Sequence, residues 1–316
     1  MPDPEGYGTQ PWNPPEARNR TLQQQMNRRL ALFAATLLIF IAAFAVTATA
    51  LFCRATLHVP RRLGPRPPNS SEVTLLARDG APLKAWWFQA QLSNGNCVLV
   101  LHGIGDSRAG AAGFAPMFLD AGYSVLTPDS RAHGASGGDF VTYGLLEKYD
   151  VLDWAAWMKQ QGCRELYALG ESLGAVILIQ SAAVQPVFSA IVAECAYADL
   201  LDAGADRMSR FAGVPRPLAR VMVEGAMVYA RWVDGLDLRS VSPLRDIARA
   251  PTPILLIHGL NDRRTPPSNS LRLERANPRN SLWLVPGASH TGAYAAAPVE
   301  FRRRVLTWFA DHPTTT

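Results

Sequence analysis

Between residues 166 and 174 the chain reads Leu166-Tyr-Ala-Leu169 and then Gly170-Glu171-Ser172-Leu173-Gly174. The first run has the length and apolar character of a buried strand, and the residues after Gly174 continue well as a helix. A Gly-x-Ser-x-Gly sequence between a strand and a helix predicts a turn so tight that small residues must flank the serine. Such a turn lifts the Ser172 hydroxyl above the sheet edge and aims the first helical amides at negative charge beside it. Ser172 is therefore the candidate nucleophile.

Short apolar runs on both sides of this stretch predict the rest of a sheet. They are residues 97–101, 124–126, 166–169, 190–193, 254–257 and 282–285, with helical patterns between them. Continuous apolar runs of this length are typical of parallel strands that are covered on both faces. Ahead of them, residues 73–78 and 83–88 flank the turn dipeptide Asp79-Gly80, which predicts an antiparallel hairpin. The sequence therefore predicts an α/β fold with a doubly wound, mostly parallel sheet and an antiparallel N-terminal edge.

One segment, residues 199–249, interrupts the alternation of strands and helices. It is rich in Met, Arg and Ala and is broken by Pro215 and Pro217, so we expect a helical cap inserted between two strands. Apolar residues recur in it at roughly helical spacing: Met208, Phe211, Val214, Met222, Val223, Met227 and Trp232. Two roles are open for them. They pack the cap onto the main domain, or they roof the cleft above Ser172 and accept an acyl chain.

The N-terminal region divides into three predicted parts. Residues 1–29 are polar and are expected to be a disordered tail. Residues 30–53 carry no charge and are long enough to cross a bilayer. The rival interpretation is a cleaved signal peptide, because Ala48-Thr-Ala50 has the A-x-A form; the apolar core exceeds the about 7–15 residues of such peptides, which favours a signal anchor. Residues 54–71 are a Pro/Arg-rich linker, and the globular domain covers residues 72–312.

The orientation of this single-pass membrane protein is set by its basic residues. Arginines are equally frequent on the two sides of the span, but the short tail is basic next to it. We therefore expect a cytoplasmic N-terminus and an extracytoplasmic globular domain.

Composition excludes two classes of function. The net charge is +5, but the chain has few lysines and no basic stripe interleaved with aromatic residues, so nucleic-acid binding is not expected. The four cysteines form no CxxC or Cys/His ligand spacing, which argues against zinc. Because Cys53 ends the apolar span, an odd number is left for the domain. Buried thiols are therefore expected rather than a disulfide framework. The four are Cys53, Cys97, Cys163 and Cys195.

A serine nucleophile needs a general base, and the base needs an orienting acid. His290 follows the run 282–285 on a glycine-bearing loop, and Asp262 follows the run 254–257. Catalytic groups in such sheets gather at the carboxyl ends of strands, where all three residues fall. Alone, Asp262 could cap the helix that starts near Pro266, and His290 could be a solvated loop residue. The order Ser172, Asp262, His290 favours a catalytic triad.

The second anion-binding element is predicted after the run 97–101, in His102-Gly103-Ile104-Gly105. An acyl-transfer intermediate carries a negative oxygen that is best held by two fixed backbone amides, and we expect those of Ile104 and Leu173. His102 and His133 are then loop-shaping residues. Neither has a second ligand at helical spacing, so no metal site is expected there.

With these motifs the chain resembles the serine α/β-hydrolase superfamily, in particular its ABHD-like branch of membrane-associated esterases, acylglycerol lipases and peptidase-like hydrolases. The resemblance is carried by His102-Gly103, the segment 129–134, Gly170–Gly174, the segment 259–262 and His290. It covers residues 72–312 and implies an α/β-hydrolase fold without metal or organic cofactor.

The expected function is that of a membrane-anchored serine hydrolase. It would cleave carboxylic esters, small or lipid-like, through an acyl-enzyme, with Ser172 attacking, His290 moving the proton and Asp262 orienting His290. A serine peptidase or amidase on the same fold is one alternative. A non-catalytic scaffold that keeps the fold is another.

Overall fold

The computed structural model describes residues 15–313. The chain divides into two compact units, residues 1–50 and 51–316. Helix α1 (Pro15–Leu57) makes up the described part of the first unit and ends in the second. Within it, Leu22–Leu57 has the length and apolar composition of a helix that crosses a membrane. A signal sequence near the N-terminus has the same two properties.

The helix begins earlier than the sequence predicted. Because α1 starts at Pro15, the expectation of a disordered tail is wrong for residues 15–29, while residues 1–14 lie outside the described part. Proline is tolerated at the first helical position, and the Leu, Gln, Met and Arg residues that follow are good helix formers. A helix nucleated in the apolar run therefore extends through them at one hydrogen bond per residue.

The helix also ends later than predicted, inside the second unit. Residues 54–57, which were predicted to belong to the linker, are helical. The part of the predicted linker without helix or strand is therefore residues 58–70. Cys53 and Leu57 are each 1% exposed. The Leu57 carbonyl accepts a hydrogen bond from Val141 N (2.9 Å), and the Thr56 carbonyl accepts one from the Tyr143 hydroxyl (2.7 Å). The last turns of α1 are thus built into the globular domain.

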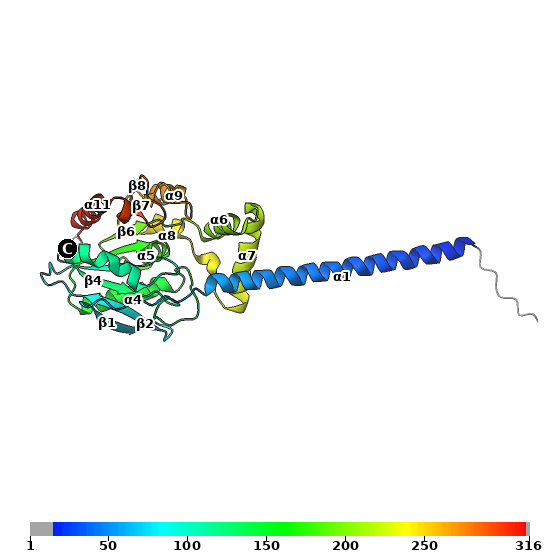
Figure 1. Ribbon diagram of the computed structural model, residues 1–316, viewed down its shortest axis with the longest axis horizontal. Coiled ribbons are helices and arrows are strands. Elements are labelled where there is room, and N and C mark those ends of the chain that lie inside the picture. The colour runs from blue at the N-terminus through cyan, green and yellow to red at the C-terminus, as the bar shows by residue number, and fades with distance from the viewer. Residues whose placement is uncertain (1–14, 314–316) are drawn as a thin grey trace, which may run out of the picture. The chain divides into compact units, whose positions relative to one another are not determined.

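The second unit contains an eight-stranded sheet of order β1-β2-β4-β3-β5-β6-β7-β8 (Figure 1). The strands are β1 Ser71–Leu76, β2 Pro82–Phe88, β3 Cys97–Leu101, β4 Ser124–Pro128, β5 Leu166–Glu171, β6 Ala190–Glu194, β7 Ile254–Gly259 and β8 Ser281–Val285. β1 and β2 pair antiparallel, β2 and β4 pair antiparallel, and the remaining pairs are parallel. The predicted mostly parallel sheet with an antiparallel N-terminal edge is confirmed.

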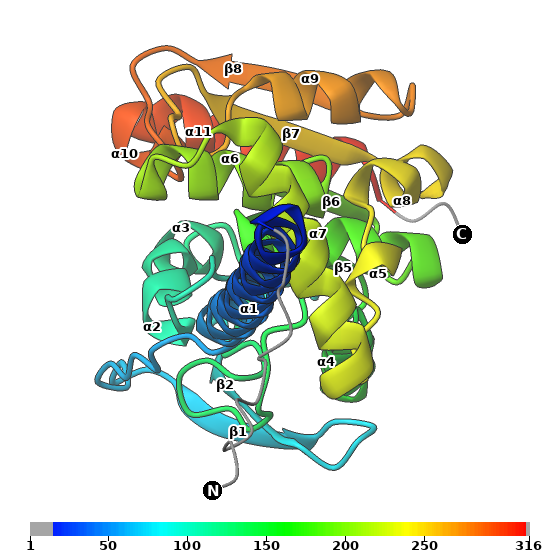
Figure 2. The same cartoon turned by 90° about the vertical axis from the view of Figure 1, so that its right-hand side faces the viewer.

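Helices cover both faces of the sheet, which explains why β3, β4, β5, β6 and β7 are buried along almost their whole length. Alternate residues of β3 enter two different hydrophobic clusters, Leu99 and Leu101 in one and Val98 and Val100 in the other. Figure 2 shows α2, α3, α10 and α11 on one side of the sheet and α4, α5 and α8 on the other. Their bounds are α2 Arg108–Ala111, α3 Ala115–Leu119, α4 Glu147–Gln160, α5 Leu173–Val184, α8 Pro243–Arg249, α9 Ser268–Arg275, α10 Ala293–Ala296 and α11 Pro298–Asp311, with 3₁₀ turns η1 Ala112–Phe114 and η2 Leu238–Ser240.

The predicted helical cap lies between β6 and β7. It consists of α6 (Leu200–Ala212) and α7 (Arg216–Val233), followed by η2 and α8. Gly213, with φ +66°, ends α6 in the left-handed region that glycine tolerates. Of the seven apolar residues singled out in the sequence, Met208, Val223 and Met227 are buried, as the packing alternative expects. Phe211 and Trp232 instead point into solvent.

The expectation of buried thiols is wrong for two of the four cysteines. Cys97 and Cys163 form a disulfide with a Cα–Cα distance of 5.7 Å, while Cys53 and Cys195 are free and buried. Cys97 is the first residue of β3, and Cys163 lies three positions before the first residue of β5. β3 and β5 are neighbours in the sheet, with Cys97 opposite Leu166. Strand order, which residue spacing does not show, brings the two sulfurs together.

Candidate active site

The turn between β5 and α5 holds Ser172 in a conformation that side chains rarely adopt. Its φ is +51° and its ψ is −109°. The Ser172 amide donates to the Glu194 carbonyl (2.8 Å), which fixes the turn to the end of β6. A Cβ on Gly170 would lie 2.5 Å from the carbonyl carbon of Gly174, and one on Gly174 would lie 2.3 Å from Leu101 O. Both flanking positions therefore require glycine.

The structure brings together the three residues that the sequence placed at strand ends. Ser172 follows β5, Asp262 follows β7 and His290 follows β8. His290 Nε2 lies 2.9 Å from Ser172 Oγ, and His290 Nδ1 lies 2.7 Å from Asp262 Oδ2. The Asp262 side chain is buried, whereas Ser172 and His290 are partly exposed. Ser172 and His290 thus reach the protein surface in part, while the Asp262 carboxylate is shielded from water.

Hydrogen bonds keep the buried Asp262 carboxylate ionised. Oδ1 accepts from the amides of Arg264 (2.8 Å) and Thr265 (2.9 Å), and Oδ2 accepts from His290. Burial alone would raise the pKa of Asp262, but the hydrogen bonds from His258, His290 and the Thr265 amide hold it well below its usual range. The N-cap of α9 is Pro267, so the helix-cap alternative for Asp262 does not apply.

A further histidine, His258, contacts the same carboxylate. It is fully buried, and its Nε2 lies 2.7 Å from Thr265 O and 3.2 Å from Asp262 Oδ2. A carbonyl oxygen only accepts, so Nε2 carries the hydrogen and Asp262 Oδ2 is a second acceptor for it. Nδ1 of His258 lies 2.6 Å from Ser270 Oγ. Sequence reasoning missed this residue because it sits within the apolar run of β7, where a histidine looks like part of the core.

The loop after β3 lies directly against the nucleophile. A Cβ on Gly103 would be 3.4 Å from the Cβ of Ser172. Among the described residues, none accepts a hydrogen bond from the amide of Ile104 or of Leu173. Both predicted N–H groups are therefore available to an oxygen from outside the protein.

Two neutral histidines hold this loop. His102 Nδ1 donates to Gly103 O (2.8 Å), and its Nε2 accepts from the Ser130 amide (3.1 Å). His133 Nε2 accepts from the Gly105 amide (3.1 Å). Burial lowers the pKa of His102, and it lowers the pKa of His133 to about 4. Their predicted role as loop-shaping residues is confirmed.

Two carboxyl groups lie behind the nucleophile, on neighbouring strands. Glu171 ends β5 opposite Glu194, which ends β6. Glu194 Oε1 accepts from the Ala293 amide (2.9 Å) in the segment after His290, and its Oε2 has no hydrogen-bond partner among the described residues. Burial raises the pKa of Glu194 to about 7, and burial together with Glu194 and Asp106 raises that of Glu171 to about 8.

One group of possible metal ligands overlaps the site. A ligand atom of each of Cys195, Asp262 and His290 lies within 4.8 Å of the others. The Cys195 sulfur accepts from the Thr291 amide (3.4 Å), and burial raises the pKa of the thiol, so it is neutral. Both Asp262 oxygens already accept N–H donors, and both His290 nitrogens are engaged by Asp262 and Ser172. These residues fit a proton relay better than a cation site.

Known proteins are similar to this chain in sequence and in fold. A model of the alpha/beta hydrolase family matches residues 98–304. The protein YqkD of Bacillus subtilis strain 168 is 29% identical over 216 residues, which are 66% of this chain and 70% of that protein. The Pyrococcus furiosus esterase Pf2001 has a TM-score of 0.66 at 25% identity, covering 81% of this chain and 99% of the esterase. A puromycin-hydrolyzing peptidase of Mycobacterium tuberculosis has the same fold, with a TM-score of 0.62 at 19% identity over 78% of this chain and 40% of the peptidase.

Proposed function

Because the chain belongs to the alpha/beta hydrolase family, we propose that it is a serine hydrolase that cleaves carboxylic esters through an acyl-enzyme. The observation that carries this proposal is the hydrogen-bonded line from Ser172 Oγ through His290 to Asp262. A hydroxyl next to the imidazole nitrogen that can take its proton, with a buried carboxylate on the other nitrogen, is the arrangement that activates a serine.

In the proposed reaction Ser172 Oγ attacks the ester carbonyl while His290 Nε2 removes its proton. Asp262 stays ionised and stabilises the imidazolium that forms. The amides of Ile104 and Leu173 hold the negative oxygen of the tetrahedral intermediate. His290 then protonates the leaving alcohol, and a water molecule repeats the sequence on the acyl group to release the acid.

An ester is favoured over an amide as the substrate. The esterase Pf2001 reaches 25% identity over almost its whole length, whereas the likeness to the peptidase extends to the fold alone. Hydrolysis of a peptide or amide by the same residues is the second candidate. A non-catalytic scaffold would have no need of a strained serine hydrogen-bonded to a histidine.

We further propose that α1 is a signal anchor and that the hydrolase domain lies outside the cytoplasm. The disulfide between Cys97 and Cys163 supports this side of the membrane, because such bonds persist in oxidising compartments. An enzyme held at a bilayer meets esters that partition into lipid, so lipid-like acyl esters are the proposed substrate class.

The test is hydrolysis by the full chain in detergent micelles. The substrates are p-nitrophenyl esters of graded acyl length and a panel of peptide p-nitroanilides, with Ser172→Ala as the matched control. We expect ester cleavage that rises with acyl length to a limit and is lost in the variant. Cleavage of the anilides without the esters would replace the esterase by an amidase, and residual turnover in Ser172→Ala would place the nucleophile elsewhere.

A further inference from the structure

Helix α7 is apolar on two opposite sides. Its inner side packs into the domain through Ala219, Val223, Ala226, Met227 and Ala230, which are buried. Its outer side carries a second row at helical spacing, here called the outer stripe: Leu218, Val221, Gly225, Val228 and Trp232. Leu218 is 53% exposed, Val221 is 68% exposed and Trp232 is 82% exposed.

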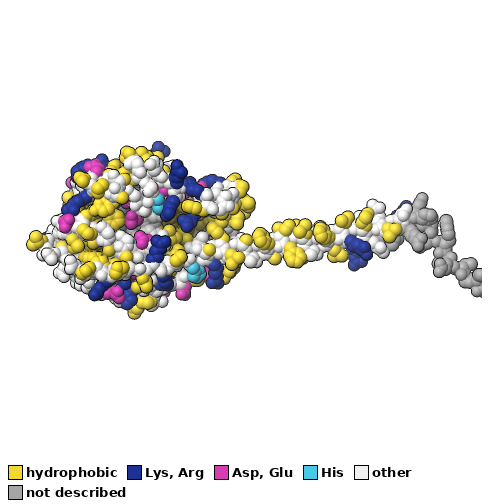
Figure 3. All heavy atoms as spheres, in the orientation of Figure 1, with side chains coloured by type: hydrophobic (Ala, Val, Ile, Leu, Met, Phe, Trp, Pro, Cys, Tyr) yellow, Lys and Arg dark blue, Asp and Glu magenta, His cyan; other side chains and the backbone are white. Residues whose placement is uncertain are grey.

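The outer stripe has the character of an interaction surface. It contains no charged residue over the length of α7, and Phe211 of the neighbouring helix α6 is also exposed. Figure 3 shows hydrophobic side chains gathered at the edge of the domain that α6 and α7 form. Contiguous apolar surface of this kind on a folded domain marks a site of contact with a protein or a membrane.

The path of α1 indicates that a membrane is what contacts the outer stripe. α1 runs without a break from the apolar span to Leu57, and its last turns belong to the domain. Cys53 and Leu57 are part of the same hydrophobic cluster as Val223 and Met227 on the inner side of α7. No irregular segment therefore separates the span from the domain that carries the outer stripe.

Helix length sets where the bilayer would end. About 20 apolar residues cross the hydrocarbon core, and the uncharged run ends at Cys53 with Arg54 next. The headgroup layer then lies at about the level of Arg54, where the chain is already part of the domain. An exposed tryptophan on an apolar helix is suited to that layer.

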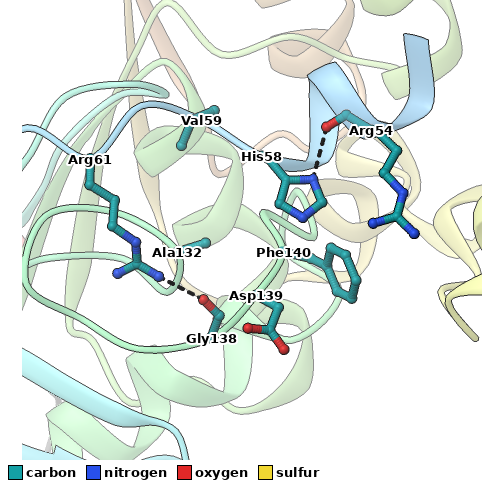
Figure 4. Close-up of a pocket in the computed structure, with 8 residues that line it drawn as sticks. All are labelled: Arg54, His58, Val59, Arg61, Ala132, Gly138, Asp139 and Phe140. Carbon is teal, nitrogen blue, oxygen red and sulfur yellow. Dashed lines mark hydrogen bonds between the residues drawn. The ribbon is translucent and has the colours of Figure 1, made fainter. Parts of the chain in front are cut away.

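Basic residues at the end of α1 complement lipid phosphates. A hollow of about 400 Å³ is lined there by Arg54, His58 and Arg61 together with Val59, Ala132, Gly138, Asp139 and Phe140 (Figure 4). Arg61 is held by the carbonyls of Ser136 and Gly138. The Arg54 guanidinium has no ion-pair partner in the described part of the chain, so it is free for a phosphate.

We propose that the outer stripe of α7 docks on the surface of the bilayer that α1 crosses, so that the cap lies in the headgroup layer. This proposal rests on the membrane-anchored hydrolase proposed above. The outer stripe is then the surface through which the hydrolase domain receives substrate from the lipid. It also accounts for the exposure of Trp232, which the sequence had suggested as a lining of the cleft.

The experiment places a fluorescent probe on the stripe of the full chain in phosphatidylcholine–phosphatidylglycerol vesicles. Val221→Cys carries the probe, and Val299→Cys, at a residue of α11 that is 82% exposed, is the matched control. The native free thiols Cys53 and Cys195 are buried. Doxyl-labelled phosphatidylcholine should quench the probe at position 221 about three-fold more than at position 299.

Equal, weak quenching at the two positions would overturn the proposal. An emission shift at position 221 that follows the protein-to-lipid ratio and ignores the quencher would also overturn it, in favour of a second copy of the chain. The same vesicles are washed with carbonate and labelled with a fluorophosphonate. Retention and labelling without quenching at position 221 would refute the outer stripe alone. Extraction by carbonate would refute the anchor and the stripe together, and loss of labelling would refute the serine mechanism.

A second variant pair gives a functional readout. Val221→Ser with Trp232→Ser removes apolar surface from exposed positions outside the catalytic residues. Turnover of a long-chain ester presented in the vesicles should fall about three-fold or more, while turnover of dissolved p-nitrophenyl acetate stays unchanged. Equal rates on the vesicle-borne ester would count against docking through this face.

Discussion

Opening the disulfide between Cys97 and Cys163 should lower the free energy of unfolding of the domain by about 4 kcal/mol. The two cysteines are separated by 66 positions in sequence. Closing a loop of that length in the unfolded chain removes entropy of about 2.1 + 1.5R ln n cal/mol/K, which gives about 4 kcal/mol at room temperature. Both cysteines are buried, so replacement by alanine exposes no new polar group and leaves the loop-closure contribution as the main change.

The assay is thermal unfolding of the full chain in micelles, followed by tryptophan fluorescence. For a unit of this size about 1 kcal/mol shifts Tm by about 2 °C, so Cys97→Ala with Cys163→Ala should melt about 8 °C below the wild type. Reductant should lower the Tm of the wild type by a similar amount and leave that of the double variant unchanged. A double variant that melts within about 2 °C of the wild type would refute the reasoning. So would alkylation of both cysteines in the native protein without reductant.

Asp262→Asn should reduce kcat by about four orders of magnitude, because His290 loses the charge that orients it. The control Asp199→Asn keeps the N-cap of α6, made by Asp199 Oδ1 and the Asp202 amide, and should keep full activity. Equal activity of the two variants would contradict the assignment. His258→Leu should lower kcat about ten-fold through loss of a donor to Asp262, whereas His258→Gln, which keeps an N–H at that place, should retain most of it. If the two His258 variants are equally active, the donor has no catalytic effect. Burial raises the pKa of Glu194 from 4.5 to about 7, so the folded protein binds that proton more tightly and stability should fall as pH rises between these values. Glu194→Gln should remove this part of the slope of Tm against pH, and an unchanged slope would contradict it.

Strands β3 to β7 could be predicted from sequence because they are covered on both faces. Each strand is then a continuous apolar run, and such runs are visible without knowledge of the partner strands. The positions of Ser172, Asp262 and His290 followed from the same pattern, since residues after parallel strands share one edge of the sheet. The features that were missed depend on contacts between distant segments. The disulfide of Cys97 and Cys163 needs the order of the strands, and the contact of His258 with Asp262 needs the path of the loop after β7.

The ends of α1 and the orientation of the cap were missed for a different reason. Hydropathy identifies the residues that are apolar enough to lie in lipid, but a helix continues into neighbouring residues that are good helix formers. α1 therefore begins at Pro15 and ends at Leu57, beyond both ends of the apolar run. Helical spacing identified the apolar residues of α7 but not which side they face. Val223 and Met227 turned out to pack inward, and Trp232 turned out to face solvent.

The central claim, that Ser172 is an activated nucleophile, is tested most directly by covalent labelling. The full chain is treated with a fluorophosphonate, digested and analysed by mass spectrometry, with Ser172→Ala and Asp262→Asn treated in parallel. The geometry of Ser172, His290 and Asp262 predicts one phosphonylated peptide, modified at Ser172, with no adduct in Ser172→Ala and a much slower one in Asp262→Asn. An unlabelled wild-type protein, or an adduct on a different residue, would contradict the account.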